Sequence, residues 1–490
     1  MTSTPDLDRP AGEVSSTTMT EPKLAGTMTT FDIVFTVLAF NAPLADFVGY
    51  LTVIIGYANG LGTPSIFIAA GLLVFVFAAG FTTMSKHLPN PGAFYAYVTA
   101  GLGKPLGLGA AFLAIASYVF LYVSSYIYGG TSLTALVSDV FHGPHIDWWV
   151  FNVALIVICG VLGYFRITLS ARILTAAMVL EVVLIVIYDT VVFVQGGHEG
   201  FTSSAVDPHF VFSGSLGLAA LFGIGMFSGF EATAIFREEA RDPERTIPRA
   251  TYIMIGVIAV LYGITSYALI VGVGPSTVVA SAAADPTGTA IGTVDAYLGT
   301  VGKDLVVVLL CSSVFAAILA MHNITARYLF SMGRDGVFPR ALGKVHASHG
   351  SPYIASATTT GLAVLFLIGL LISKADNLTV YARLAGIALY ALIMLLLMTS
   401  AAIAAYFWVR PDHGLGKWKT LYSPVIAGIG FVVALVLATQ NASFLVGGSK
   451  SAATILIVFF FAMVVVGAVY AIALRSTRPD VYARIGRQDL

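Results

Sequence analysis

Residues 31–57 read FDIVFTVLAFNAPLADFVGYLTVIIGY, an apolar stretch that is interrupted in its middle by Asn41, Pro43 and Asp46. A second apolar stretch is interrupted by GIGMFSGFE at residues 223–231. In hydrocarbon, an irregular backbone is tolerated only where it lines a cavity or is buried in protein. Two interrupted spans, each followed by an acid, therefore predict a binding site at mid-membrane, an arrangement typical of secondary transporters.

The composition excludes an ordinary soluble protein. Of the 490 residues, 58% are hydrophobic and 10% are charged, whereas a soluble domain has about 25% charged residues. We therefore predict an all-α integral membrane protein. The formal net charge of +0 gives no sign of nucleic-acid binding. No Walker-type glycine loop is present in the sequence to suggest a nucleotide-driven pump.

Twelve stretches of the chain are apolar over the roughly 20 residues that a membrane-spanning helix needs. Residues 1–26, rich in Ser, Thr, Pro and charge, are expected to form a disordered cytoplasmic tail. The outer segment near 274–302 is expected to be a loop with a single short helix. The predicted spans are 31–57, 64–86, 105–136, 147–165, 171–195, 215–239, 247–273, 303–333, 351–373, 379–409, 420–438 and 452–474.

The basic residues are distributed unevenly between the two sides of these spans. Most lie in alternate loops and in the two tails, while the other side keeps only Lys303, Lys374 and Lys450, with Arg383 just inside the tenth span. Cytoplasmic loops of membrane proteins carry an excess of Lys and Arg. The pattern therefore predicts a multi-pass protein of the cell membrane with both termini in the cytoplasm.

Several motifs resemble those of one transporter family, in the family's order along the chain. The sixth span carries GFE at 229–231 and leads into the acidic loop EEARDPERTIPRA at 238–250. The loop HLPNPGAFYAY at 87–97 resembles the family's second-to-third-span loop. ARYLF at 326–330 and RDGVFP at 334–339 resemble the end of its eighth span. By these motifs the chain resembles the amino acid-polyamine-organocation superfamily of permeases.

The resemblance implies the leucine-transporter-type fold: two inverted five-helix repeats with the first and sixth spans broken, and the substrate site between their unwound parts. Residues 27–410 are then expected to form the transport core, divided into about 27–200 and 210–410. Residues 411–475 are expected to form two accessory helices, and 476–490 a cytoplasmic tail.

The break in the first span departs from one pattern of that family. Many amino acid carriers of the family have a Gly-Ser-Gly-type break, whose bare amides take the substrate carboxylate. Here the break is Asn41-Ala42-Pro43, closer to the variant in some polyamine importers. Both an amino acid and a polyamine therefore stay open as substrates.

The candidate substrate-binding residues surround the two breaks. Asp46 can attract the ammonium group of a substrate or a coupling cation, or it can cap the outer half-helix. Pro43 alone predicts a kink, and the glycines after residue 222 can expose carbonyls or simply allow close packing. The positions are Asn41, Ala42, Pro43, Leu44, Asp46, Gly225, Phe227, Ser228 and Gly229.

A further candidate for the pocket wall is Tyr122. Tyr118, Tyr122 and Tyr126 recur every four residues and share one face of the third span, which borders the site in the fold that the resemblance implies. The alternative is that this tyrosine stripe packs against neighbouring helices.

Glu181 is the candidate coupling residue. It lies nine residues beyond Arg172, or about 13.5 Å along a helix, near the bilayer centre. A carboxyl group at that depth is costly to ionise and can load and release a proton near neutral pH; the alternative is a paired structural acid. Ser312 and Ser313 resemble the hydroxyls that ligate sodium in sodium-coupled relatives of this fold, although a structural role is the favoured interpretation of serines in membrane helices.

The remaining buried or rim charges are candidates for gating. We interpret Glu231 as structural or gating rather than as a substrate ligand. Arg383 can snorkel outward or form a gate ion pair. Arg327, with Arg334, Asp335 and the charges of the loop at 237–249, can form an inner gate of ion pairs.

The sequence thus predicts a secondary active transporter that carries a small amino acid, by symport with a proton. The alternatives are a polyamine or other amine permease, an exchanger, sodium coupling, and a membrane sensor that does not transport. We find no catalytic constellation and no metal-ligand cluster in the sequence, so neither an enzyme nor a cofactor is expected. The expected partners are the solute, the coupling ion and the bilayer, and the oligomeric state stays open.

Overall fold

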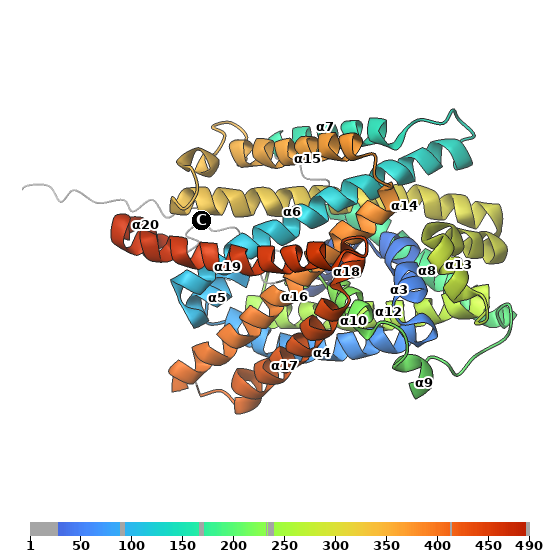
Figure 1. Cartoon of the computed structure of the whole chain (residues 1–490), viewed down its shortest axis with the longest axis horizontal. Coiled ribbons are helices and arrows are strands. Elements are labelled where there is room, and N and C mark those ends of the chain that lie inside the picture. Colours follow the sequence, from blue (N-terminus) through green and yellow to red (C-terminus); the bar gives the residue numbers. More distant parts are fainter. Residues whose placement is uncertain are drawn as a thin grey trace, which may run out of the picture.

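The computed structural model describes residues 28–88, 94–165, 171–231, 233, 240–411 and 414–486. The expected tail at 1–26 lies outside these residues. The described chain consists of helices and their connections, with one isolated β-bridge between Met28 and Ala240. In Figure 1 most of the long helices run along the long axis of the molecule.

Ten helices of the described chain are long and apolar enough to cross a membrane, and a bent pair at the start makes eleven. The sixth predicted span is represented by the shorter α10 (Leu216–Gly225), because most of its second half lies outside the described residues. The ten helices are α4 (Thr63–Ser85), α6 (Lys104–Ala135), α7 (Trp148–Phe165), α8 (Ala171–Gln195), α12 (Pro243–Val273), α14 (Pro286–Asp335), α15 (Tyr353–Ser373), α16 (Asn377–Val409), α17 (Ser423–Gln440) and α19 (Lys450–Thr477).

The bent pair is the first predicted span, and it breaks where Pro43 predicts. It consists of α1 (Thr30–Asn41), α2 (Pro43–Ala45), a π-helical turn at Asp46–Leu51 and α3 (Thr52–Tyr57). The two halves bend by 41°.

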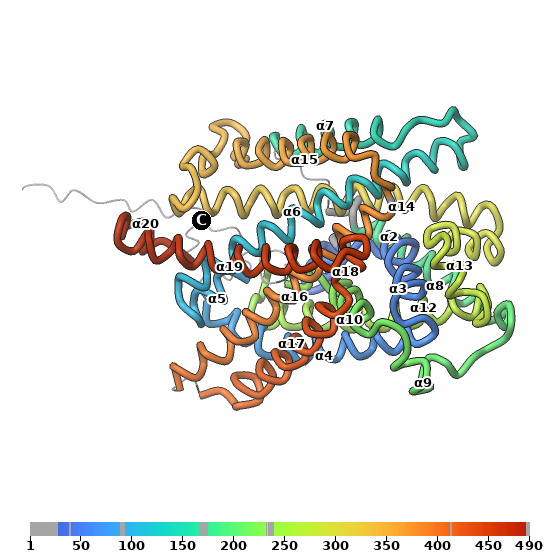
Figure 2. The backbone as a smooth tube through the Cα atoms, in the orientation of Figure 1, coloured from blue at the N-terminus to red at the C-terminus, as the bar shows by residue number. Residues whose placement is uncertain are grey.

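Helix α6 is central to the packing and contacts α16, α19, α14 and α7. Figure 2 shows α7 and α15 at one edge of the molecule and α4 and α17 at the other. Small residues allow the closest approaches: a Cβ atom added to Gly467 of α19 would lie 2.7 Å from the Cα of Gly109 of α6.

The membrane helices differ in how much of their surface is covered by protein. For α16, 78% of the most apolar 18-residue window is buried, against 17% for α19. An apolar helix with so much exposed surface is stable in lipid rather than in water. Helix α16 therefore belongs to the core, while α19 packs one face on α6 and presents most of its side chains outward.

The segment 274–302 contains more helix than the sequence predicts. It holds α13 (Val278–Ala284), which packs against α3, and the first turns of α14, which begins at Pro286. Gly299 interrupts α14 with φ 69° and ψ −179°, a conformation that only glycine adopts readily. The expectation of a single short helix is wrong, because Asp285 caps a new helix where the sequence suggested a loop.

At the opposite end of the molecule, the region expected to be the C-terminal tail folds against the core. Residues Pro479–Arg484 form α20, beside α5 (Phe94–Leu102) in Figure 1. Val481 and Ile485 are buried in an apolar cluster with Tyr95, Leu108, Ala111, Met332 and Val337. The Tyr95 hydroxyl donates to Asp335 Oδ2 at 2.9 Å and accepts from the Gly486 amide at 2.5 Å. One tyrosine thus joins α5, α14 and the C-terminal segment.

Candidate functional site

The break in the first span is built around Ala42. Its backbone is left-handed, with φ 50° and ψ 68°, which costs a residue with a Cβ atom about 1–2 kcal/mol. Pro43 has no N–H with which to continue α1, and it suits the first position of a new helix. The Asn41 side chain donates from Nδ2 to the carbonyl oxygen of Met226 at 2.6 Å. That hydrogen bond ties the first break directly to the second.

The second break follows Gly225, where α10 ends. Gly229 adopts φ 97°, a region that favours glycine. Its amide donates to Glu231 Oε2 at 2.9 Å, and the Tyr118 hydroxyl of α6 donates to Glu231 Oε1 at 2.7 Å. Both carboxyl oxygens of Glu231 are therefore engaged in holding the break against α6. This geometry favours the structural interpretation of Glu231.

A cavity of about 60 Å³ lies between the two breaks. Five predicted substrate positions line it, namely Asn41, Ala42, Asp46, Gly225 and Ser228. The other predicted substrate positions, Pro43, Leu44, Phe227, Gly229 and Tyr122, do not. The remaining lining residues are Ala45, Tyr50, Leu121, Ser125, Tyr128, Met226, Val314, Ala317, Met321, Tyr381 and Leu389.

Asp46 carries the sole charged side chain among the described residues that line the cavity. It is 6% exposed, and its Oδ2 accepts a hydrogen bond from the Tyr262 hydroxyl of α12 at 2.6 Å. The capping alternative does not match the geometry, because the outer half-helix begins at Pro43 and has no side-chain cap. Asp46 instead starts the π-helical turn, an irregularity that is frequent at functional sites.

Three tyrosines form an aromatic wall of the cavity. The rings of Tyr128 and Tyr381 are stacked with centroids 4.7 Å apart, and Tyr50 lies 5.6 Å from Tyr381. The sequence analysis missed all three. A signal was available only for Tyr50, which lies one turn beyond Asp46 on the same helix. Such a wall beside one acid suits a cation, because aromatic faces attract positive charge.

Glu181 lies behind the first break rather than in the cavity lining. It is 1% exposed, and its Oε2 accepts from Ser313 Oγ at 2.7 Å and from the Leu44 amide at 3.4 Å. Helices α8, α14 and α2 therefore meet at one carboxyl group. Two of the three coupling candidates lie together. The third, Ser312, is exposed and donates to the Leu309 carbonyl of its own helix.

Tyr122 belongs to a separate polar network. Its hydroxyl lies 3.0 Å from that of Tyr126 and 2.9 Å from His322 Nδ1 of α14. His322 Nε2 lies in turn 2.9 Å from the Ser356 hydroxyl of α15. The network fully engages the imidazole and joins α6, α14 and α15. The face of α6 that reaches the cavity is instead that of Leu121, Ser125 and Tyr128.

The predicted gate arginines lie away from the cavity. Arg383 is near the predicted outer connection after α18 (Ala442–Leu445), where a Cβ atom added to Gly447 would meet its guanidinium at 2.9 Å. Arg327 is exposed on α14. The rim residues Arg237, Glu238 and Glu239 lie outside the described residues.

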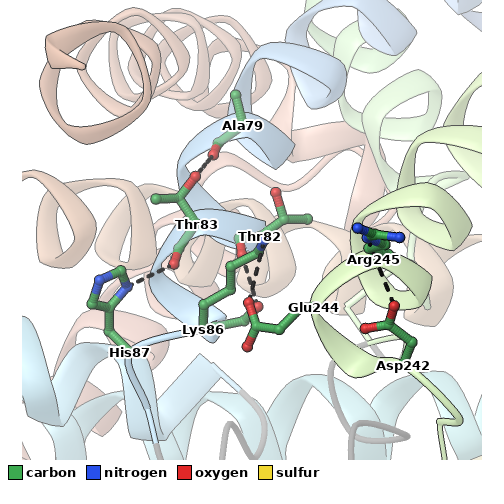
Figure 3. Close-up of polar contacts among 9 residues, drawn as sticks. Ala79, Thr82, Thr83, Lys86, His87, Asp242, Glu244 and Arg245 are labelled. Atoms are coloured by element: carbon green, nitrogen blue, oxygen red, sulfur yellow. Dashed lines mark hydrogen bonds and ion pairs between the residues drawn. The ribbon is translucent and has the colours of Figure 1, made fainter. Parts of the chain in front are cut away.

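At the predicted inner end, one ion pair joins the end of α4 to α12 and a second lies within the first turn of α12, as Figure 3 shows. Lys86 Nζ lies 3.4 Å from Glu244 Oε2, and Arg245 Nε lies 3.8 Å from Asp242 Oδ2. Both pairs are partly exposed, so each contributes little stability, at most about 1 kcal/mol. Ion pairs that weak can open and close during a conformational change.

Comparison with known proteins finds a permease family and permease relatives. The family model "Amino acid permease" matches residues 27–469. The low-affinity putrescine importer PlaP of Escherichia coli (strain K12) is 25% identical over 437 residues, 87% of this chain and 91% of that protein.

Two further relatives carry amino acid names. The branched-chain amino acid permease BcaP of Lactococcus lactis subsp. cremoris is 23% identical over 398 residues, 77% of this chain and 81% of that protein. The lysine-specific permease LysP of the same organism is 26% identical over 369 residues, 69% of each chain.

Proposed function

Since this chain belongs to the amino acid permease family, it is a membrane transporter rather than an enzyme, and we propose that it imports a small amine-bearing solute by symport with protons. Twelve spans are proposed, in two inverted repeats at about 27–200 and 210–410 followed by two accessory helices at 411–475. Both termini are placed in the cytoplasm, and the membrane is the cell membrane.

The observation that carries the substrate proposal is the charge of the cavity lining. Among the described lining residues, Asp46 supplies one negative charge and none supplies a positive one. An ammonium group can therefore pair with Asp46 while its alkyl chain lies against the tyrosine wall. The lining favours an amine over the small amino acid that the sequence favours.

A second candidate substrate, an amino acid, depends on backbone amides for its carboxylate. Pro43 has no amide N–H to offer, and the Leu44 amide points at Glu181. A carboxylate in the cavity would thus lie near Asp46 without an amide from Pro43 or Leu44, and its donors would be neutral hydroxyls such as those of Ser125 and Ser228, an arrangement that opposes binding. Because BcaP and LysP are named as amino acid permeases, amino acids are included in the uptake test below.

Glu181 is proposed as the coupling group. When ionised, it accepts hydrogen bonds from Ser313 and from the amide end of the outer half-helix, where the helix dipole favours negative charge. Protonation removes that charge and weakens both bonds. The outer half of the first span is then free to move relative to α8 and α14. Release of the proton to the cytoplasm restores the bonds.

Uptake into proteoliposomes tests both parts of the proposal. Labelled amines and amino acids are offered in parallel, with a proton gradient or a sodium gradient imposed. We expect accumulation of an amine with acid outside, and competition by decarboxylated analogues that exceeds competition by the parent amino acids. Uptake that requires sodium and ignores pH would contradict proton coupling. Stronger competition by amino acids would move the substrate assignment to that class.

A further inference from the structure

A second buried acid lies on α8, beyond Glu181. Asp189 follows Glu181 by eight residues, about 12 Å along the helix, and it is 5% exposed. Its Oδ2 accepts a hydrogen bond from Thr265 Oγ1 of α12 at 2.8 Å. Its Oδ1 is buried without a hydrogen-bond partner among the described residues. With the N-terminus in the cytoplasm, this position is in the outer half of the membrane.

Among the described acids, a buried carboxyl oxygen without a partner is found at Asp189 and at Asp304, and of these two residues Asp189 is the buried one. Both oxygens of Glu231 and both ring nitrogens of His322 have partners. A group that only holds helices together is expected to be fully paired, because an unpaired buried polar atom costs free energy. The carboxyl group of Asp189 instead keeps one oxygen open to a proton.

The side chains around Asp189 carry hydroxyl groups, as at Thr265. Helix α12 faces it with Thr265 and, one turn earlier, brings Tyr262, whose hydroxyl bonds to Asp46. Helix α14 contributes Tyr297, which packs near the neighbouring Tyr188. The described α1 has its single acid, Asp32, at its far end, and α2 has no ionisable side chain. No ion pair with Asp189 is found within the described residues.

We propose that Asp189 is the outer proton-loading group of this carrier and that it supplies the proton to Glu181. This inference rests on the proposed proton symport. Asp189 takes a proton from outside water at Oδ1. The proton then passes to ionised Glu181, which leaves Asp189 ionised and Glu181 neutral, so charge and protons balance. Because about 12 Å exceeds hydrogen-bond distance, water in the opened site must complete the path.

The test compares two variants in proteoliposomes. Asp189→Asn keeps an oxygen for the Thr265 hydroxyl but cannot hold the proton. Thr265→Val removes the hydrogen bond and keeps the carboxyl group. We expect Asp189→Asn to lower pH-driven initial uptake by about 100-fold or more, as for loss of a positioned proton-transfer group, while solute exchange at equal pH is unchanged. Thr265→Val should keep the dependence of uptake on external pH.

The outcomes separate the inference from the proposed function. If wild-type uptake is not driven by protons, the proposed function fails. If wild-type uptake is driven by protons and Asp189→Asn has the same external-pH profile, the role of Asp189 is overturned. Equal losses of exchange in both variants would also overturn it, because they indicate a purely structural bond. If Asp189→Asn does not fold, Asp189→Glu is tested in its place. Because this variant keeps a carboxyl group, it must retain uptake driven by a pH gradient, and its failure to do so would overturn the role of Asp189.

Discussion

Asp46 combines two roles in one carboxyl group, since it faces the cavity and also accepts from Tyr262. Asp46→Asn keeps the shape and an acceptor for Tyr262 but removes the charge. We expect the amine to lose about 1.5–3 kcal/mol of binding free energy, or roughly 10- to 100-fold in affinity. Binding to purified protein in detergent measures this loss, with expression level as the control. Unchanged affinity would place the ammonium group elsewhere.

Glu181 offers a second test at a single residue. Glu181→Gln fixes the group in a neutral form, so it should retain solute exchange and lose accumulation driven by a pH gradient. Ser313→Ala and Ser312→Ala form a matched pair, because the first hydroxyl donates to Glu181 and the second bonds within its own helix. We expect only Ser313→Ala to alter the pH dependence of uptake. If the Glu181→Gln variant still accumulates solute under a pH gradient, Glu181 is not the coupling residue.

At the scale of elements, the second break is held to α6 by the Tyr118–Glu231 hydrogen bond. Tyr118→Phe removes the donor and leaves a buried carboxyl oxygen unpaired, which costs about 1–3 kcal/mol. We expect a lower melting temperature of the detergent-solubilised protein and an amine affinity close to wild type. Tyr122→Phe is a matched control from a different network of the same helix. A variant with normal stability and lost binding would make Glu231 part of the substrate site.

The broken first span illustrates what the sequence can predict. Pro43 and Asp46 stand out because polar or helix-breaking residues are costly within an apolar stretch, and the structure has the break there. The rotation of α6 was not predictable in this way. Tyr122 and Tyr126 share one face and Leu121, Ser125 and Tyr128 the next, and only the packing of neighbouring helices decides which face meets the cavity.

The residues that complete the site come from distant parts of the chain. Tyr381 and Asp189 sit in helices without an internal proline, and Tyr262 lies far along α12 from the proline at Pro248. A tyrosine in a membrane helix can face lipid, a neighbour or a cavity, so its residue type alone carries little information. Asp189 was visible as an acid in an apolar stretch and was overlooked beside Glu181.

At the scale of the whole molecule, the C-terminal segment braces the predicted inner end. Val481 is buried among α5, α6 and α14 residues. Val481→Asp places a charge there and should detach α20. We expect faster solute exchange with unchanged affinity, because the inner ends of α5 and α14 lose a shared contact. Arg484→Ala, at a half-exposed position of the same helix, is the control. Identical exchange rates in both variants would show that the contact has no part in the cycle.

The left-handed backbone of Ala42 has a consequence for how this carrier can diverge. A codon for Ala becomes one for Gly by a single base change, and Gly adopts φ 50° without strain. The same change removes a methyl group from the cavity lining and so leaves more space beside Asp46. Larger branched residues at this position are opposed by both backbone strain and burial. Substitutions at residue 42 are thereby restricted mainly to glycine, while Pro43 still offers no amide N–H at the break.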